Sequence, residues 1–209
     1  TGLKRSTLDT YLNEAKEAGD ILVRNLQRAA DLLLSFKEVA VDQSSTRRRH
    51  FRLLDVVNEV LTTTRPLFKN AKHEITLSIP ADLALDSYPG PLEQVLTNFL
   101  ANSLNHGFEG LAQGQITIQV QQEGHEVVLE YADNGCGIAA GNLQHIFEPF
   151  YTTKLGRGGS GLGLYIVYNL VSNVLGGSIT AHSTPGAGAR FVLRLPAQAP
   201  AHSGPAPLH

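Results

Sequence analysis

Asp133-Asn-Gly-Cys-Gly137 is one of four short segments that decide how this chain is interpreted. Asn98-Phe-Leu-Ala-Asn102 precedes it, and Phe147-Glu-Pro-Phe-Tyr-Thr-Thr-Lys154 and Gly159-Ser-Gly-Leu-Gly163 follow it. The set contains a metal-binding amide, a carboxylate at the end of a predicted strand, a basic flap and a glycine-rich helix start. These are the parts that a site for a magnesium nucleotide needs, and they occur in a fixed order.

The Asp133 segment suits a flat ligand. Its glycines let the backbone approach closely, and the carboxylate can accept a hydrogen bond from an exocyclic amine such as that of adenine. Taken alone, the segment is better explained as an ordinary Asp-Asn-Gly turn, because such turns are common.

A row of amides follows one face of the helix that we predict over residues 89–106. The row has spacings of four, four and three residues and comprises Gln94, Asn98, Asn102 and Asn105. An exposed polar face is the alternative, but the other sides of this helix are apolar and a buried amide needs a partner. Magnesium bound to ATP would be such a partner, since it takes oxygen ligands, and we expect Asn102 to be the direct ligand.

The glycine-rich segment leads into an apolar helix predicted over residues 162–175. Free N–H groups and the positive end of a helix dipole attract phosphate at such a start. The G-x-G-x-G spacing matches neither the dinucleotide fingerprint nor a P-loop. Lys154 lies just upstream on a predicted mobile flap, where its charge could reach a terminal phosphate, whereas Arg157 is better explained as a solvated surface residue.

Periodicity outside these segments predicts a mixture of helices and strands. Apolar residues alternate with polar ones in several short runs, and we expect an amphipathic helix over residues 54–69. The predicted strands cover residues 73–79, 116–120, 127–131, 178–182 and 190–195. The Pro- and Ala-rich tail from Ala197 has no periodicity, and we expect it to be disordered.

An unbroken heptad pattern runs from Ser6 to about Asp42, and Ser6 with Asp9 resembles a capping box. A helix of this length with a narrow apolar stripe favours a bundle or coiled coil over a helix that packs within its own domain. We therefore expect dimerisation through it. The basic run Arg47-Arg48-Arg49-His50 then marks a solvated junction.

Composition limits the other function classes. The net charge of -2 gives no broad positive field, so a nucleic-acid partner is not expected. The single cysteine, Cys136, excludes an internal disulfide, argues against zinc and fits a reducing compartment. No apolar run reaches the roughly 20 residues that span a bilayer, and the absence of methionine suggests a fragment of a longer protein.

In combination, the four segments resemble the N, G1, F and G2 boxes of the sensor histidine kinases, which share an ATPase superfamily with gyrase, MutL and the large heat-shock chaperones. The resemblance covers nearly all of residues 6–196. It implies an α+β fold: a two-layer α/β sandwich at 53–196, with a mixed sheet packed on helices and a lid at about 139–160. Residues 1–45 would be the second helix of a dimerisation and phosphoacceptor hairpin, 46–52 a junction and 197–209 a disordered tail.

The same resemblance implies residue roles. Asn102 would coordinate Mg²⁺, Asp133 would read the adenine, Gly135 and Gly137 would shape that contact, and Gly161 and Gly163 would border the phosphates. The implied catalytic residues are Asn98, Asn102 and Lys154. The remaining nucleotide-binding residues are Asn105, His106, Ile138, Phe150, Thr153, Gly159, Ser160 and Leu162.

The implied reaction moves the γ-phosphoryl of ATP to a histidine and then to an aspartate of a response-regulator receiver domain. Hydrolytic members of the superfamily carry a glutamate where Asn98 stands, and an amide cannot act as a base, so we expect slow ATP hydrolysis. The family's histidine motif, followed by an acidic residue and a proline, is missing, and we expect the acceptor upstream of Thr1.

Other departures and alternatives stay open at this point. Asn105 stands where the family often has lysine, and Ala189 replaces the threonine of the late G-x-G-Thr stretch. A non-catalytic nucleotide-binding sensor and an anti-sigma-type serine kinase are the alternative functions, although the long helix argues against the second. We expect a cytoplasmic location, with the full-length protein anchored to the inner membrane only through an upstream segment.

Overall fold

The computed structural model describes residues 11–23, 25, 47–68, 73–153 and 160–201, and the chain divides into two units, residues 1–41 and 42–209. In the first unit, residues 11–23 are helical. Its apolar side chains Tyr11, Leu12, Ile21, Leu22 and Val23 are all exposed. The rest of the helix predicted from Ser6 to Asp42 lies outside the described residues.

The second unit is built on a five-stranded mixed sheet in the order β2-β4-β5-β7-β6. The strands are β2 (Glu74–Ser78), β4 (Gln115–Glu123), β5 (Glu126–Asp133), β6 (Ser178–Ser183) and β7 (Ala189–Pro196). Strand β2 runs parallel to β4, and the remaining neighbours are antiparallel. Alternating Ile116, Ile118 and Val120 are buried, as the period of two requires. The predicted α+β class is confirmed.

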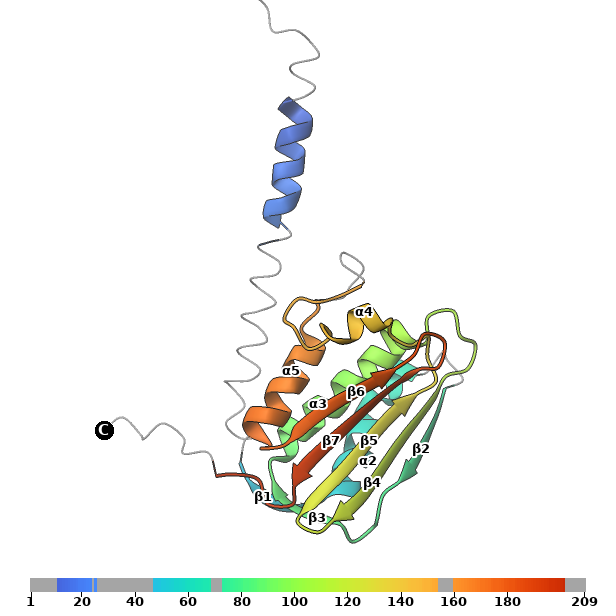
Figure 1. Ribbon diagram of the computed structural model, residues 1–209, viewed down its shortest axis with the longest axis vertical. Coiled ribbons are helices and arrows are strands. Elements are labelled where there is room, and N and C mark those ends of the chain that lie inside the picture. Colours follow the sequence, from blue (N-terminus) through green and yellow to red (C-terminus); the bar gives the residue numbers. More distant parts are fainter. Residues whose placement is uncertain (1–10, 24, 26–46, 69–72, 154–159, 202–209) are drawn as a thin grey trace, which may run out of the picture. The chain divides into compact units, whose positions relative to one another are not determined.

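Helices cover one face of this sheet (Figure 1). They are α2 (Leu53–Thr64), α3 (Pro89–Asn102) and α5 (Gly163–Asn169), while the short α4 (Ala140–Leu143) follows β5. Phe99 of α3 joins the two layers, because its ring lies 4.7 Å from that of Phe191 and 5.0 Å from that of Tyr131, centroid to centroid. All three side chains are buried, so α3 rests directly on the middle of the sheet.

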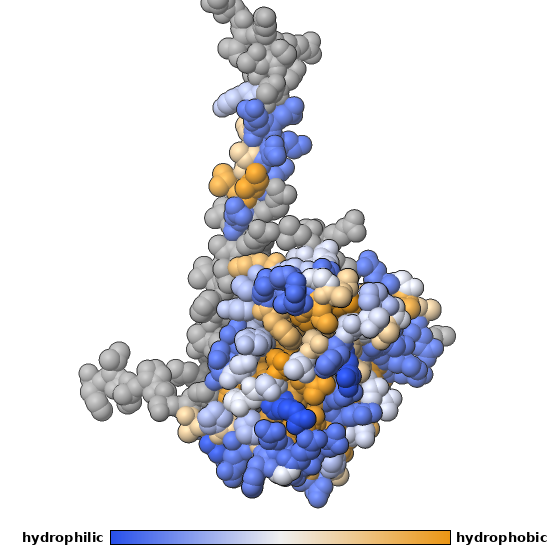
Figure 2. All heavy atoms as spheres, in the orientation of Figure 1, coloured by the Kyte–Doolittle hydropathy of each residue, from blue (hydrophilic) through white to orange (hydrophobic). Residues whose placement is uncertain are grey.

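The other face of the sheet presents polar side chains around a central apolar strip (Figure 2). Arg190 of β7 pairs with Glu130 of the neighbouring β5 at 3.1 Å, and Arg194 of β7 pairs with Glu123 at the end of β4, two strands away, at 2.9 Å. A sheet covered by helices on one face explains the alternation of apolar and polar residues in β4 and β7.

Two helices widen at their ends instead of continuing as α-helix. The helix predicted to reach His106 is α-helical only to Asn102 and continues as the π-helical η2 (Ser103–Gly107). In the same way α5 continues as the π-helical η3 (Leu170–Val174), and α2 tightens into the 3-10 helix η1 (Arg65–Phe68). Among the described residues, no helix is long and apolar enough to cross a membrane.

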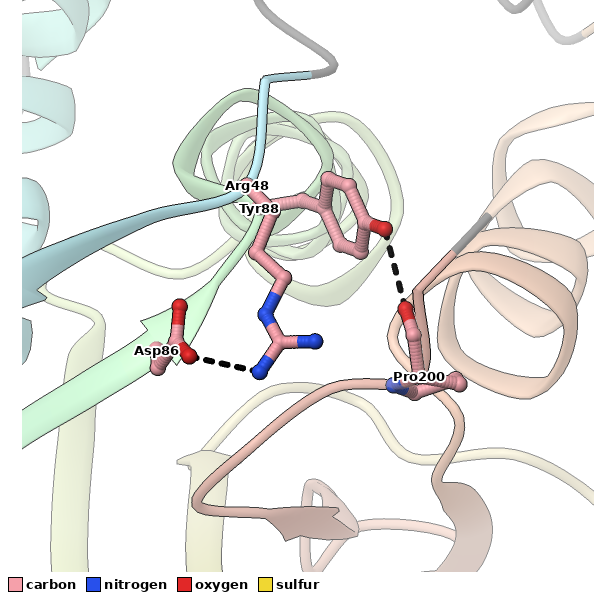
Figure 3. Close-up of polar contacts among 4 residues, drawn as sticks. All are labelled: Arg48, Asp86, Tyr88 and Pro200. Atoms are coloured by element: carbon pink, nitrogen blue, oxygen red, sulfur yellow. Dashed lines mark hydrogen bonds and ion pairs between the residues drawn. The ribbon is translucent and has the colours of Figure 1, made fainter. Parts of the chain in front are cut away.

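A small second sheet forms where the sequence predicts a junction. Strand β1 (Arg49–Arg52) pairs antiparallel with β3 (Ala84–Ser87), and neither strand was predicted. The neighbouring Arg48 forms an ion pair with Asp86 (Figure 3). This pair lowers the pKa of Asp86 below its ordinary value, chiefly through the hydrogen bond that the guanidinium donates.

The start of the predicted disordered tail is instead held by that second sheet. Asp86 donates its N–H to the carbonyl of Ala197 and accepts from the N–H of Ala199, at 2.9 Å each. The hydroxyl of Tyr88 donates to the carbonyl of Pro200 at 2.9 Å (Figure 3). Backbone pairing of this kind needs no sequence periodicity. Residues 202–209 lie outside the described residues.

Candidate functional site

The amide row of α3 faces the glycine-rich start of α5. A Cβ atom added at Gly163 would lie 3.1 Å from Oδ1 of Asn98 and 3.8 Å from Oδ1 of Asn102. The first and last of the four sequence segments therefore meet in space. Hydrogen at position 163 keeps the two amides open toward the helix start.

Asn98 and Asn102 differ in their hydrogen bonds. Asn98 donates its Nδ2 hydrogen to the carbonyl of Gln94 at 3.0 Å, one turn back along the helix. Nδ2 of Asn102, in contrast, is the only buried side-chain nitrogen or oxygen in the described part of the chain without a hydrogen-bond partner. Such atoms are rare in folded proteins, because an unmet buried donor costs about 1–3 kcal/mol.

Asp133, the last residue of β5, is held from three sides. Its Oδ2 accepts from the hydroxyl of Ser103 at 2.7 Å, and its Oδ1 accepts from the N–H of Gly135 at 2.9 Å and of Ala189 at 3.2 Å. These donors come from η2, the following turn and β7. The carboxylate is consequently fixed before any ligand arrives.

The hydroxyl of Ser103 also forms a hydrogen bond with a second hydroxyl, that of Tyr131. The Tyr131 hydroxyl lies 2.8 Å from Oγ of Ser103, and both residues are buried. Burial raises the pKa of Tyr131 well above its ordinary value, so the phenol keeps its proton throughout the physiological range.

Close backbone packing completes the environment of Asp133. Gly188 has a φ of 77°, and a Cβ there would lie 1.8 Å from the Asp133 carbonyl oxygen. In the predicted turn, the N–H of Cys136 donates to the carbonyl of Gly107 at 2.8 Å, and a Cβ at Gly135 would lie 2.7 Å from the Cα of Gly107. The turn thus closes on η2, next to the carboxylate.

Further predicted site residues make backbone or side-chain contacts near these groups in the chain. Ile138 donates its N–H to the hydroxyl of Ser183 at 2.7 Å. Gly161 has a φ of 71°, and a Cβ there would lie 2.5 Å from the carbonyl carbon of Phe150, so the F segment packs on the glycine-rich segment. The hydroxyl of Ser160 accepts from the N–H of the buried Leu162 at 3.3 Å.

Not every predicted residue is placed. Lys154 and Gly159 lie outside the described residues, as do the residues between them near the end of the predicted lid. Asn105 and His106 belong to η2, and Thr153 ends the described part of the F segment. Gly137, with a φ of 72°, approaches Thr184: a Cβ there would lie 2.2 Å from the Thr184 carbonyl oxygen.

Sequence reasoning missed Ser103 and Tyr131. One signal was available, since Tyr131 and Asp133 are two residues apart on one strand and so share a face. Ser103 gave a weaker signal, a hydroxyl beside the amide row. In the described part of the chain, no group of three or more His, Cys, Asp or Glu is placed to hold a metal ion.

Comparisons with known proteins place the chain in a known family. Residues 88–199 match the family described as "Histidine kinase-, DNA gyrase B-, and HSP90-like ATPase". The two-component sensor PprA of Pseudomonas aeruginosa is 41% identical over 140 residues, which are 64% of this chain and 15% of PprA. The sensor histidine kinase ZraS of Klebsiella oxytoca is 35% identical over 191 residues, 88% of this chain and 38% of ZraS.

Solved structures show the same fold. The catalytic domain of the histidine kinase ThkA has a TM-score of 0.64 at 24% identity and covers 73% of this chain and 97% of its own. Full-length ShkA, solved in complex with AMPPNP, has a TM-score of 0.62 at 25% identity and covers 94% of this chain and 40% of its own. The chain spans well under half the length of either PprA or ZraS.

Proposed function

The chain belongs to the family of histidine kinase-, DNA gyrase B- and HSP90-like ATPases, whose domain binds ATP, and from this premise we propose that it is the catalytic part of a two-component sensor histidine kinase. It would transfer the γ-phosphoryl group of ATP to a histidine outside these 209 residues and from there to an aspartate of a response-regulator receiver domain. The names of its relatives PprA and ZraS support this reading.

The unpartnered amide of Asn102, set against Gly163, carries the proposal. A phosphate oxygen would accept from its Nδ2, and a magnesium ion would take its Oδ1 as a ligand. Bound with the triphosphate, magnesium would supply charge neutralisation at the transferring phosphoryl group. The lack of a cluster of acidic or imidazole ligands among the described residues suits an ion that is held largely by phosphate oxygens.

At the other end of the nucleotide, Asp133 would accept a hydrogen bond from the exocyclic amine of adenine. The three donors already on its carboxylate keep it in one orientation for that contact. Gly135, Gly137 and Ile138 would lie along the base, and Gly161, Leu162 and Gly163 along the phosphates. The roles of Lys154 and Gly159 stay predictions.

Asn98 separates a kinase from a hydrolase in this proposal. Its amide donates to the carbonyl of Gln94 and has no group that can take a proton from water. Positioning and electrostatics would then favour transfer to a histidine that the protein itself presents.

The proposal extends to partners and location. The exposed apolar side chains of residues 11–23 are what a helix that pairs with a second copy would present, which supports a homodimer. A supply of ATP and a response-regulator partner imply the cytoplasm for this part of the protein, with any membrane anchor upstream.

A labelling experiment on the full-length protein tests the proposal. With [γ-³²P]ATP and Mg²⁺ we expect acid-labile phosphate on the protein, its loss in Asn102→Ala, and normal labelling in the matched control Asn173→Ala, whose amide is exposed and pairs with Asn169. ATP binding without labelling would favour the non-catalytic sensor. Rapid release of inorganic phosphate would instead identify a hydrolase.

A further inference from the structure

Three polar groups form a buried line behind the base end of the site. The Tyr131 hydroxyl lies 2.8 Å from Oγ of Ser103, and that oxygen lies 2.7 Å from Oδ2 of Asp133. Tyr131 is 0% exposed and Ser103 is 2% exposed, so water does not compete for either hydroxyl. Neither residue belongs to the four segments that identify the family.

The direction of the hydrogen bonds follows from counting protons. An ionised carboxylate only accepts, so the single proton of Ser103 is donated to Asp133. The Tyr131 hydroxyl must then donate to Ser103. Because burial keeps the phenol protonated, this direction does not reverse near neutral pH.

The same counting leaves Asp133 with one acceptor position. Each carboxylate oxygen offers about two lone-pair sites. Oδ1 uses both for the N–H groups of Gly135 and Ala189, and Oδ2 uses one for Ser103. A ligand that donates one hydrogen to Oδ2 completes the set, whereas a carbonyl at that place would meet a second acceptor.

We propose that Ser103, itself held by Tyr131, is a positioning residue that fixes Oδ2 of Asp133 for an amine donor and so sets the preference for a 6-aminopurine over a 6-oxopurine. This inference rests on the proposed function, since it assumes that a purine nucleotide occupies the site. Without the Ser103 hydroxyl, the carboxylate could turn or take a water molecule, and the oxygen would no longer select for a donor.

Nucleotide selectivity in the full-length protein tests the inference. Titration calorimetry with Mg²⁺ would compare ATP with inosine triphosphate, in which a carbonyl replaces the amine. Wild type should prefer ATP. Ser103→Ala should weaken ATP binding about 5- to 15-fold, less than the roughly 13- to 160-fold of one charge-assisted hydrogen bond because the effect acts through Asp133, and leave inosine triphosphate nearly unchanged.

Two further variants keep the test decisive. Tyr131→Phe should shift the same ratio by about 2- to 3-fold, and it serves alone if Ser103→Ala does not fold. Thr97→Ala, which removes a hydroxyl that bonds the Glu93 carbonyl at 2.8 Å on the same helix, should leave the ratio unchanged.

A mainly structural role for Ser103 would lower stability, or would lower the affinities for both nucleotides equally. An unchanged ratio of the two affinities overturns the inference. A wild type that binds no ATP overturns the proposed function as well.

Discussion

Asp133 and Asn102 are the two polar side chains on which the proposed site depends, and they differ in how the fold satisfies their hydrogen bonds. Asp133 accepts three hydrogen bonds from protein donors, whereas Nδ2 of Asn102 is buried without a partner among the described residues. At the proposed base end, protein donors therefore occupy three of the four acceptor positions of the carboxylate before any ligand binds. At the proposed phosphate end, the donor of Asn102 is left without a partner, and a charged ligand would supply the missing acceptor.

The residues that serve the two ends of the proposed site are neighbours in the sequence. Asn102 is the last residue of α3 and Ser103 the first of η2, and successive helical positions differ by about 100° around the axis. Asn102 is consequently directed toward Gly163, while Ser103 bonds the carboxylate of Asp133.

Breaking the base end by crowding should have the largest effect. In Gly188→Ala the new Cβ would lie 1.8 Å from the Asp133 carbonyl oxygen, at a φ of 77°. We expect a loss of about 3 kcal/mol or more in the free energy of unfolding, from strain and overpacking together. Urea denaturation measures it.

Gly186→Ala is the matched control for that substitution. Gly186 has a similar φ of 79° in the same turn, but nothing lies within 4 Å of its added Cβ. Its cost should stay near 1 kcal/mol, the conformational penalty alone. Equal losses in the two variants would show that the close approach to Asp133 does not exist in solution.

The difference in hydrogen bonding between Asp133 and Asn102 predicts different changes in the free energy of unfolding when each is substituted in the nucleotide-free protein. Asp133→Asn offers an N–H₂ group where Ser103 donates, so the hydroxyl line must reverse and leave the Tyr131 proton without an acceptor, a loss of about 1–3 kcal/mol. Asn102→Ala breaks no hydrogen bond and removes a buried donor without a partner, so it should leave the nucleotide-free protein at least as stable as wild type. Similar losses in both variants would contradict the comparison.

The free energy of unfolding should depend on alkaline pH through the buried hydroxyl of Tyr131. The pKa of Tyr131 is raised in the folded state, whereas the tyrosine of the unfolded chain ionises near pH 10. The unfolded state therefore loses a proton first, and the stability that Tyr131 contributes is full below about pH 10 and falls above it, by at most about 1.4 kcal/mol per pH unit.

The measurement compares denaturation midpoints between pH 8 and 11. Tyr131→Phe should remove this part of the pH dependence, so its curve should be flatter than that of wild type. Tyr168→Phe, at an exposed position of α5, should keep it. A Tyr131→Phe curve parallel to wild type would mean that the phenol is not buried.

Much of this architecture could be predicted from residue patterns. Alternation over residues 116–120 predicted strand β4, and the resemblance that rests on the four segments is confirmed by the family match over residues 88–199. Both signals are local or have fixed spacing, which is what a single sequence displays. The role of each site residue, the dimer and the Mg²⁺ ligand remain predictions.

What could not be predicted depends on contacts between distant residues. Ser103 and Tyr131 are 28 residues apart, and neither position has a pattern of its own. Strands β1 and β3 have four residues each, too short for a clear period. The segment 197–200 is held mainly through backbone groups, which every sequence possesses.

The smallest stability effect should come from the phosphate end. Gly163 begins α5, and an alanine there would gain about 0.5–1 kcal/mol of helix propensity while pressing on the end of the Asn98 side chain, 3.1 Å away. These terms oppose each other, so Gly163→Ala should unfold within about 0.5 kcal/mol of wild type. Its Cβ would nevertheless occupy space in front of Asn102, and the affinity for magnesium ATP should fall. Calorimetry with and without Mg²⁺ separates the two results, and unchanged affinity would mean that the opening beside Asn102 does not receive the nucleotide.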